Sequence, residues 1–281
     1  MAALLKPLPL THPTDIFLAS SPPATNSQSS LEFSGVFRGH ELTRKDRRLA
    51  SGVAPLDVLL GGGIARGRVS EIIGARGSGR TSLAASFVAS TTRRTEVAAW
   101  IDGAASFDPA SLAGAGVDLR RVLWVAAPSV AARSARPMTR ESRVLKAAEV
   151  TLEAGGFGLV VVDFGDEARW IPQSAALRLA RAAERSGAAV VVIASRRMCG
   201  TFAVLSLVTH RVEAAFSRLT PRSPAIFDGL IFEAEIARNK LGGLGRRARL
   251  EAVLDYVAFA RSATGESGEG AGGSLDLATS R

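Results

Sequence analysis

The stretch "GRVSEIIGARGSGRTS" at residues 67–82 decides the fold of this 281-residue chain. It starts as a short apolar run, passes through a glycine-rich turn and enters a segment with helical spacing of apolar residues. The turn has the spacing of a phosphate-binding loop, Gly-x-x-x-x-Gly-Lys-Ser/Thr, with Arg80 in the place of the lysine. The stretch therefore predicts a strand, a loop that cradles phosphate, and a helix.

Glycines let such a loop point its N–H groups inward, and the N-terminus of the following helix adds partial positive charge. Thr81 stands where a hydroxyl would coordinate Mg²⁺, and Asp163 ends the apolar run "LVVVDF", where a second metal-facing group is expected. Arg80 keeps the charge of the lysine, but its fork is bulkier and planar and could fill the cradle itself. The predicted nucleotide-loop residues are Gly74, Gly77, Ser78, Gly79, Arg80, Thr81, Ser82 and Asp163. The plain alternative is a glycine-rich turn without a ligand.

Apolar runs alternate with amphipathic segments through the middle of the chain, which predicts a mainly parallel sheet covered by helices on both faces. After Ser206 the pattern favours antiparallel strands that extend the sheet. We therefore expect an α/β fold with a phosphate loop. The predicted strands are 67–74, 96–102, 121–127, 157–164 and 188–195, the helices 79–94, 139–155 and 174–187, and the C-terminal strands lie within 207–216, 230–240 and 246–259.

Composition divides the chain into three parts. Residues 1–47 are predicted to be a mobile, Pro- and Ser-rich arm that ends in a basic segment, 48–260 a core domain, and 261–281 a flexible tail. Within the tail, "SLDLA" at 274–278 is similar to peptides that bind the bacterial sliding clamp. Ser274 and Ala278 break that pattern, so a chance sequence explains it as well.

The net charge of +9 predicts an anionic partner, either DNA or an acidic protein. The arginine and alanine usage of a GC-rich genome is the alternative explanation, and a solvated charged face is the alternative for each basic cluster. The candidate DNA or anion contacts are Arg44, Lys45, Arg47, Arg48, Arg196, Arg197, Arg246 and Arg247.

The lone Cys199 excludes an internal disulfide, and the three histidines have no metal-ligand spacing, so we expect no structural metal. No apolar run is long enough for a membrane span, and the first residues do not form a signal peptide. We expect a cytoplasmic protein with no membrane contact.

Residues 51–83 and the stretch "WIDGAASFDP" at 100–109 resemble the recombinase RecA and its relatives. The resemblance implies a catalytic glutamate at position 104, where this chain has Ala104. The stretch "VVIASRRMCG" at 191–200 is similar to the family segment that enters its second DNA-binding loop, where Ser195 replaces a glutamine that senses the γ phosphate. With Arg80, three positions of one site depart together. We therefore expect no ATPase and no required cofactor, with ATP or ADP and Mg²⁺ bound weakly at most.

The stretch "EIARNKLGG" at 235–243 also resembles the family, in which a Lys-Asn-Lys sequence reaches the ATP of the neighbouring subunit. The corresponding positions here are Arg238, Asn239 and Lys240, which are candidates for docking on RecA. An exposed basic strand end is the alternative.

A shortened RecA-like core with degenerate catalytic positions resembles most closely the ImuA accessory proteins of translesion synthesis. That resemblance implies RecA, an ImuB-like inactive Y-family polymerase, an error-prone polymerase and DNA as partners, and a role in limiting RecA filaments. One alternative is an active DNA-dependent ATPase in which Arg80 replaces the lysine and Asp102 or Asp108 acts as base. Another is a cell-division inhibitor of the SulA type.

Overall fold

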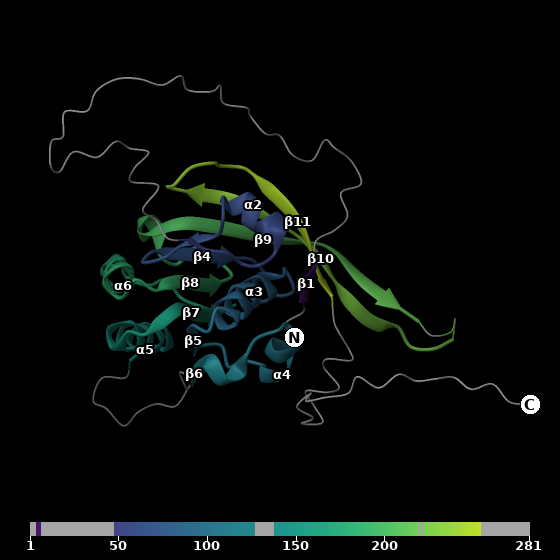
Figure 1. Cartoon of the computed structure of the whole chain (residues 1–281), viewed down its shortest axis with the longest axis horizontal. Coiled ribbons are helices and arrows are strands. Elements are labelled where there is room, and N and C mark those ends of the chain that lie inside the picture. The colour runs from purple at the N-terminus through teal and green to yellow at the C-terminus, as the bar shows by residue number, and fades with distance from the viewer. Residues whose placement is uncertain (1–3, 7–47, 127–137, 219, 221, 254–281) are drawn as a thin grey trace, which may run out of the picture.

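The computed structural model describes residues 4–6, 48–126, 138–218, 220 and 222–253. Within them, nine strands form one sheet in the order β1-β11-β10-β9-β4-β8-β7-β5-β6 (Figure 1). The strands of the parallel half are β4 (Val69–Ile73), β5 (Val97–Asp102), β6 (Val122–Ala126), β7 (Phe157–Gly165) and β8 (Ala189–Ala194). The other half contains β9 (Ala203–Ser217), β10 (Ile226–Asn239), β11 (Arg247–Val253) and the short β1 (Leu4–Lys6).

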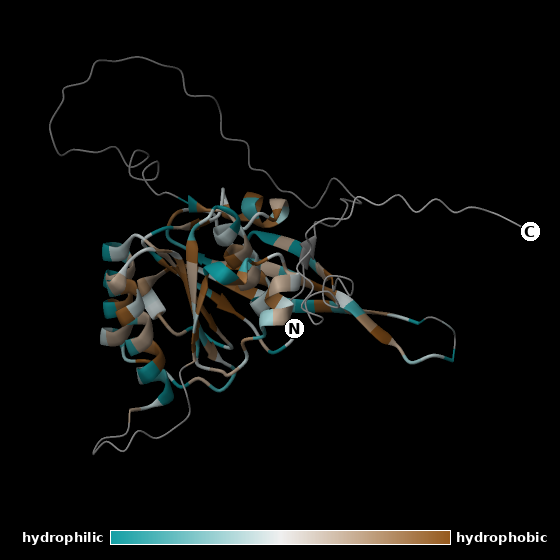
Figure 2. Ribbon diagram, turned by 60° about the horizontal axis from the view of Figure 1, so that its bottom comes forward, coloured by the Kyte–Doolittle hydropathy of each residue, from teal (hydrophilic) through white to brown (hydrophobic). Residues whose placement is uncertain are grey.

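Helices cover both faces of the parallel half, as the continuous apolar strands require. On one face lies α3 (Arg80–Arg93), and on the other lie α5 (Arg140–Ala154) and α6 (Gln173–Ser186) (Figure 1). The short α2 (Ala54–Leu60) packs instead against β11. Alternate residues of β7 face opposite ways, with Val161 in the core under α3 and Val162 in the core under α5 and α6. Figure 2 shows the apolar strands between helices that carry polar residues outward.

The register of the central strands brings three chain segments to one edge of the sheet. Ile73 of β4 pairs with Ala194 of β8, and Ala194 pairs with Gly165 of β7. Because parallel strands end at the same edge, the residues that follow these three leave the sheet side by side. They are Gly74, Ser195 and Asp166.

The C-terminal strands extend the sheet with antiparallel pairing. β9 runs parallel to β4 over its first half and pairs antiparallel with β10, and β10 pairs antiparallel with β11. The far ends of β9 and β10 continue past the end of β4 as a projecting hairpin, residues 211–217 and 226–231 (Figure 1). The predicted fold class, a mainly parallel sheet with antiparallel C-terminal strands, is confirmed.

Five strands and three helices lie where the sequence predicts them, within two residues at each end. The sequence analysis missed α2, α4 (Pro109–Gly114), the two-stranded pair β2 (Arg48–Leu49) and β3 (Ile64–Ala65), and the short 3-10 helices η2 (Leu119–Arg121) and η3 (Gly200–Phe202). These elements are too short for a clear apolar period. Within the predicted arm, residues 4–6 form β1 against β11. Residues 7–47 and the predicted tail lie outside the described residues.

No helix in the described part of the chain is both long enough and apolar enough to cross a membrane.

Candidate phosphate-loop site

The loop between β4 and α3 has the backbone of a phosphate cradle. Gly77 and Gly79 have φ of 73° and 87°, values at which glycine is favoured over other residues. Gly79 is the N-cap of α3 and makes no side-chain capping bond. The first N–H groups of α3 therefore lack a side-chain acceptor at the cap, which is the arrangement that attracts anions.

Side chains of the C-terminal strands β9 and β10 pack against the loop and fix its position. A Cβ atom on Gly79 would lie 2.5 Å from the ring of Phe232 on β10, which is fully buried. A Cβ atom on Gly74 would overlap the hydroxyls of Ser78 and Thr209, which bond each other at 2.7 Å. The loop backbone is thus part of the core packing, independently of any ligand.

The Arg80 side chain turns back into the loop. One guanidinium nitrogen donates to the carbonyl oxygen of Gly74, and the other forms an ion pair of 2.6 Å with Asp166. Arg80 is only 8% exposed, so the pair is largely shielded from solvent on its cationic side. The mostly exposed Arg76 adds a second bond to the same carboxylate at 3.1 Å.

Asp166 follows the end of β7 and is held from two sides. The hydroxyl of Ser195, at the end of β8, donates to the Asp166 carbonyl oxygen at 2.7 Å. Partial burial would raise the pKa of the Asp166 carboxyl, but hydrogen bonds and charge from Arg80 and Arg76 outweigh it and hold the pKa below its usual value. Asp166 is therefore an ionised counter-ion for the loop.

Ala104 lies against the same turn. A Cβ atom on Gly165 would come within 2.8 Å of the Ala104 Cβ, so the two backbones approach closely. Gly165 has a φ of 70°. The position where the resemblance implies a catalytic glutamate thus carries a methyl group packed on the turn that precedes Asp166.

The buried carboxylates near the loop are bound to their own chain. Asp163 accepts from the Gly165 N–H at 2.8 Å and the Ser106 hydroxyl at 3.2 Å. Burial raises its pKa, Arg80 acts against that rise, and Asp102 adds to it. Asp102 accepts three N–H bonds of 3.1 Å each, from Ala104, Ser106 and Phe107.

Asp108 caps α4 by accepting from the Ala110 N–H and the Ser111 hydroxyl. Asp102 and Asp108 are absent from the wall of the cavity described next. Their hydrogen bonds are those of a loop brace and a helix cap.

A cavity of about 760 Å³ lies between the loop and the base of the hairpin. The loop and the strand ends form one wall, with Arg80, Thr81, Ala104, Asp163 and Asp166 among its residues. The hairpin forms the other wall, with Arg211, Phe216, Phe227 and Leu230. The rings of Phe216 and Phe227 meet edge to face at 5.4 Å. One wall is thus polar and charged, and the other mostly apolar.

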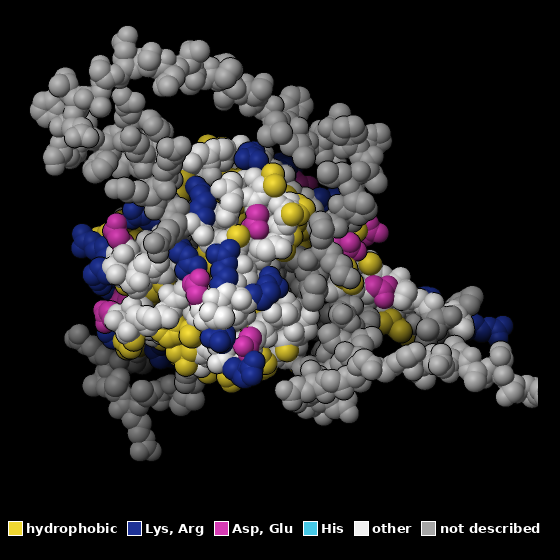
Figure 3. Space-filling view, in the orientation of Figure 1, with side chains coloured by type: hydrophobic (Ala, Val, Ile, Leu, Met, Phe, Trp, Pro, Cys, Tyr) yellow, Lys and Arg dark blue, Asp and Glu magenta, His cyan; other side chains and the backbone are white. Residues whose placement is uncertain are grey.

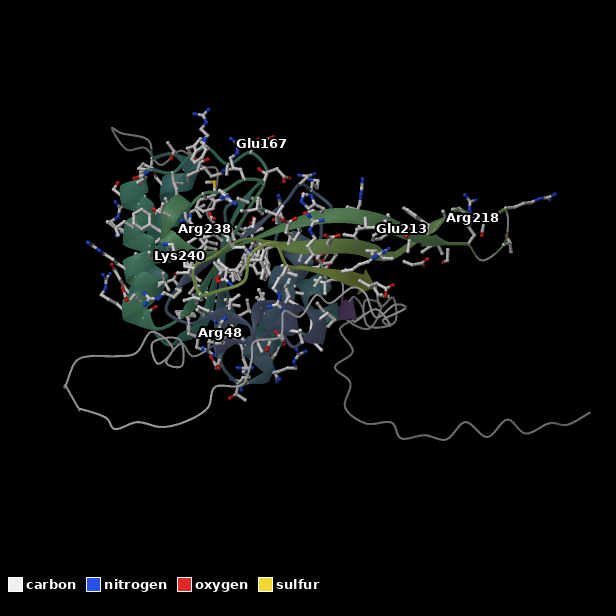
Figure 4. The ribbon with its side chains drawn as sticks, turned by 90° about the horizontal axis from the view of Figure 1, so that it is seen from above. Arg48, Glu167, Glu213, Arg218, Arg238 and Lys240 are labelled. Atoms are coloured by element: carbon white, nitrogen blue, oxygen red, sulfur yellow. The ribbon has the colours of Figure 1, made fainter. Side chains whose placement is uncertain are left out.

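The three candidate docking residues lie apart from this cavity, at the body end of β10 (Figure 4). Arg238 and Lys240 donate to the carbonyl oxygens of Gly200 and Thr201, which form the turn before β9. The Asn239 side chain accepts from the Leu241 N–H at 2.9 Å. In Figure 4, Glu213 and Arg218 lie along the projecting hairpin instead.

The candidate DNA contacts fall into three groups. Arg44, Lys45 and Arg47 lie outside the described residues. Arg48 and Arg246 donate to backbone carbonyls near α2, and Arg247 pairs with Glu233 and Glu235. Arg196 and Arg197 are exposed. Figure 3 shows basic side chains spread over the visible face with acidic ones between them.

A buried glutamate fixes the turn after β8. Glu71 of β4 is 1% exposed and accepts from the N–H groups of Met198 and Cys199 and from the Ser206 hydroxyl. Burial, followed by the charge of Glu71, raises the pKa of the Cys199 thiol well above its usual value. Cys199 is therefore an inert packing residue. The described residues contain no cluster of three or more metal-ligating side chains.

Sequence reasoning missed Asp166, Arg76 and Arg211, which line the cavity beside the phosphate loop. Asp166 could have been found by its place three residues after Asp163. The turn that follows this parallel strand leaves the sheet at the same edge as the phosphate loop. Arg211 carries no signal in the sequence, since its place beside Gly77 depends on strand pairing across the sheet.

The family model described as the RecA N-terminal domain matches residues 35–176. The chain belongs to the RecA N-terminal domain family. Protein RecA of Herpetosiphon aurantiacus is 36% identical over 132 residues, which are 45% of this chain and 34% of that protein. Protein RecA of Trichodesmium erythraeum is 39% identical over 85 residues, or 30% of this chain and 24% of that protein.

The matched region thus spans about a quarter to a third of the length of these RecA proteins. In structure, the chain is similar to the crystal structure of the RadB recombinase. The TM-score is 0.52 and the identity 20%, and the match covers 72% of this chain and 94% of that one. At that identity the likeness concerns the fold alone.

Proposed function

We propose that this RecA-family chain is an accessory protein of DNA damage tolerance, similar to ImuA, that limits RecA filaments and does not turn over ATP. The observation that carries the proposal is that Arg80, Ala104 and Ser195 all contact the turn at 165–166. Positions where the family places phosphate-binding, catalytic and sensing groups serve here to hold the chain itself.

The loss of turnover follows from what remains near the loop. Hydrolysis needs a base within hydrogen-bond reach of the attacking water, and removal of such a base costs about 10²–10⁴ in rate. Ala104 offers no base, and Asp163 is committed to Gly165 and Ser106. Mg²⁺-nucleotide fits these residues poorly, because the loop cation and the metal-facing carboxylate already have partners.

The alternative of an active ATPase receives less support. It requires Asp102 or Asp108 as the base, but Asp102 braces the loop at 104–107 and Asp108 caps α4. Neither faces the cavity beside the phosphate loop.

The partners are those of the ImuA resemblance: RecA, an ImuB-like inactive polymerase, an error-prone polymerase and DNA. Arg238 and Lys240 are the cations proposed to reach the ATP face of a RecA subunit. Each side chain donates a hydrogen bond to a backbone carbonyl. Both keep further donors for a partner, because a guanidinium has five N–H groups and an ammonium has three. A chain that docks there without an ATP site of its own would end a filament.

This proposal is tested by adding the full chain to RecA on single-stranded DNA and measuring RecA ATP hydrolysis. We expect inhibition at fewer than one chain per RecA subunit, since capping acts at filament ends. Arg238→Ala with Lys240→Ala should raise the half-inhibitory concentration about tenfold, the value of about 1.4 kcal/mol of binding.

The matched control is Lys146→Ala with Arg181→Ala, which removes the same charge from exposed positions of α5 and α6. This control should inhibit like the parent chain. Absence of inhibition by the parent chain would contradict the function, and equal inhibition by both double variants would contradict the docking residues.

A further inference from the structure

The three altered positions converge on one carboxylate-bearing turn. Arg80 pairs with the Asp166 side chain at 2.6 Å, and Ser195 donates to the Asp166 backbone at 2.7 Å. Ala104 packs on Gly165, where an added Cβ atom would lie 2.8 Å from the Ala104 Cβ. The strand register explains the meeting, because the row Ile73, Ala194 and Gly165 ends at one edge of the sheet.

A cation buried in this loop needs a counter-charge. Arg80 is 8% exposed, and an isolated charge in such surroundings is strongly unfavourable. In a phosphate loop the ligand can supply the negative charge. Here Asp166 supplies it from within the chain, since its carboxylate accepts from Arg80 and from Arg76.

We propose that Asp166 is the specificity-determining residue of this loop. It is an internal counter-ion that pairs with Arg80 and so makes the loop reject phosphate. The inference rests on the proposed loss of ATP turnover and gives it a structural cause. The loop keeps its shape and its N–H groups, but its charge is already balanced.

The adjacent Glu167 provides a contrast. It lines the same cavity and is exposed, and among the described residues it forms no ion pair with an arginine of the loop. Glu167→Gln therefore removes the same charge from the same cavity without removing the counter-ion of Arg80.

The test compares Asp166→Asn with Glu167→Gln in the full chain. We expect Asp166→Asn to lower the thermal midpoint by roughly 5–10 °C, because it leaves Arg80 without its main counter-ion. Sodium tripolyphosphate should then raise the midpoint of Asp166→Asn and bind at least about tenfold tighter than to the parent chain, at equal ionic strength. Glu167→Gln should behave like the parent chain in both respects.

If Asp166→Asn and Glu167→Gln respond equally to tripolyphosphate, the inference is overturned. If Asp166→Asn does not fold, Arg80→Gln with Asp166→Asn decides the matter. Removing both charges should restore folding, since a neutral pair needs no counter-ion. A double variant no more stable than Asp166→Asn alone would overturn the inference.

The proposed function fails separately. ATP turnover by the parent chain would contradict the accessory role, whatever the response to tripolyphosphate. A parent chain that neither hydrolyses ATP nor differs from Asp166→Asn in anion binding would keep the role and lose Asp166 as its cause.

Discussion

The glycine loop at residues 74–79 and the turn at 165–166 face the same cavity, but different forces fix them. The loop is held mainly by close packing, since Phe232 lies under Gly79 and the mutually bonded Ser78 and Thr209 hydroxyls leave no room for a Cβ atom on Gly74. The turn is held by polar contacts with Arg80 and Ser195. A loop whose glycines pack against buried side chains has a backbone fixed by the core, whereas the turn depends on which polar groups surround it.

The largest effect is expected on the loop side. Gly79→Ala should cost roughly 3 kcal/mol of unfolding free energy, because it combines a positive φ with a clash on Phe232. Gly187→Ala is the matched control, since Gly187 has nearly the same backbone conformation and open space around its Cβ position. It should cost about 1 kcal/mol.

Urea unfolding followed by circular dichroism measures both losses. Equal losses for the two variants would mean that the loop does not depend on the core for its shape, and the contrast between packed loop and polar turn would disappear.

A smaller effect is expected at Asp163, which lies on β7 just before the turn at 165–166. Burial raises the pKa of this carboxyl, so the folded chain holds its proton to higher pH than the unfolded chain does. Its ionisation therefore costs stability as pH rises above about 3.9, the ordinary pKa of aspartate, and costs nothing below it. Asp163→Asn removes this cost while keeping the shape of the side chain.

Asp163→Asn should have the same thermal midpoint as the parent chain near pH 4 and a higher one at pH 7. The difference at pH 7 should correspond to on the order of 1 kcal/mol in the free energy of unfolding. Melting curves across this range give the difference directly. A variant less stable than the parent chain at pH 7 would show that the Asp163 charge supports the site, as a metal-facing carboxylate would.

The sequence predicts the parallel half of the fold well, because its strands and helices are long and clearly periodic. The run "FGLVVVDF" and the segment 174–187 fall on β7 and α6 within two residues. Short elements such as α2 and α4 escape prediction, since seven residues and six residues carry little period.

The site is predicted in part. Gly74, Arg80, Asp163 and Ser195 can be identified one by one from the motif and the resemblance. The sequence cannot predict that Arg80 and Ser195 share Asp166 as a partner. That contact depends on the register of β4, β8 and β7 and on how the arginine side chain turns. The sequence predicts altered groups at these positions, and only the structure shows that the side chains of Arg80 and Ser195 contact Asp166.

The most direct test of the account is ATP hydrolysis by the purified chain, measured as phosphate release with Mg²⁺ and single-stranded DNA. Arg80→Ala serves as the control, since it removes the loop cation. The account predicts that the parent chain and Arg80→Ala release phosphate at the same background rate. Hydrolysis by the parent chain that disappears in Arg80→Ala would contradict it.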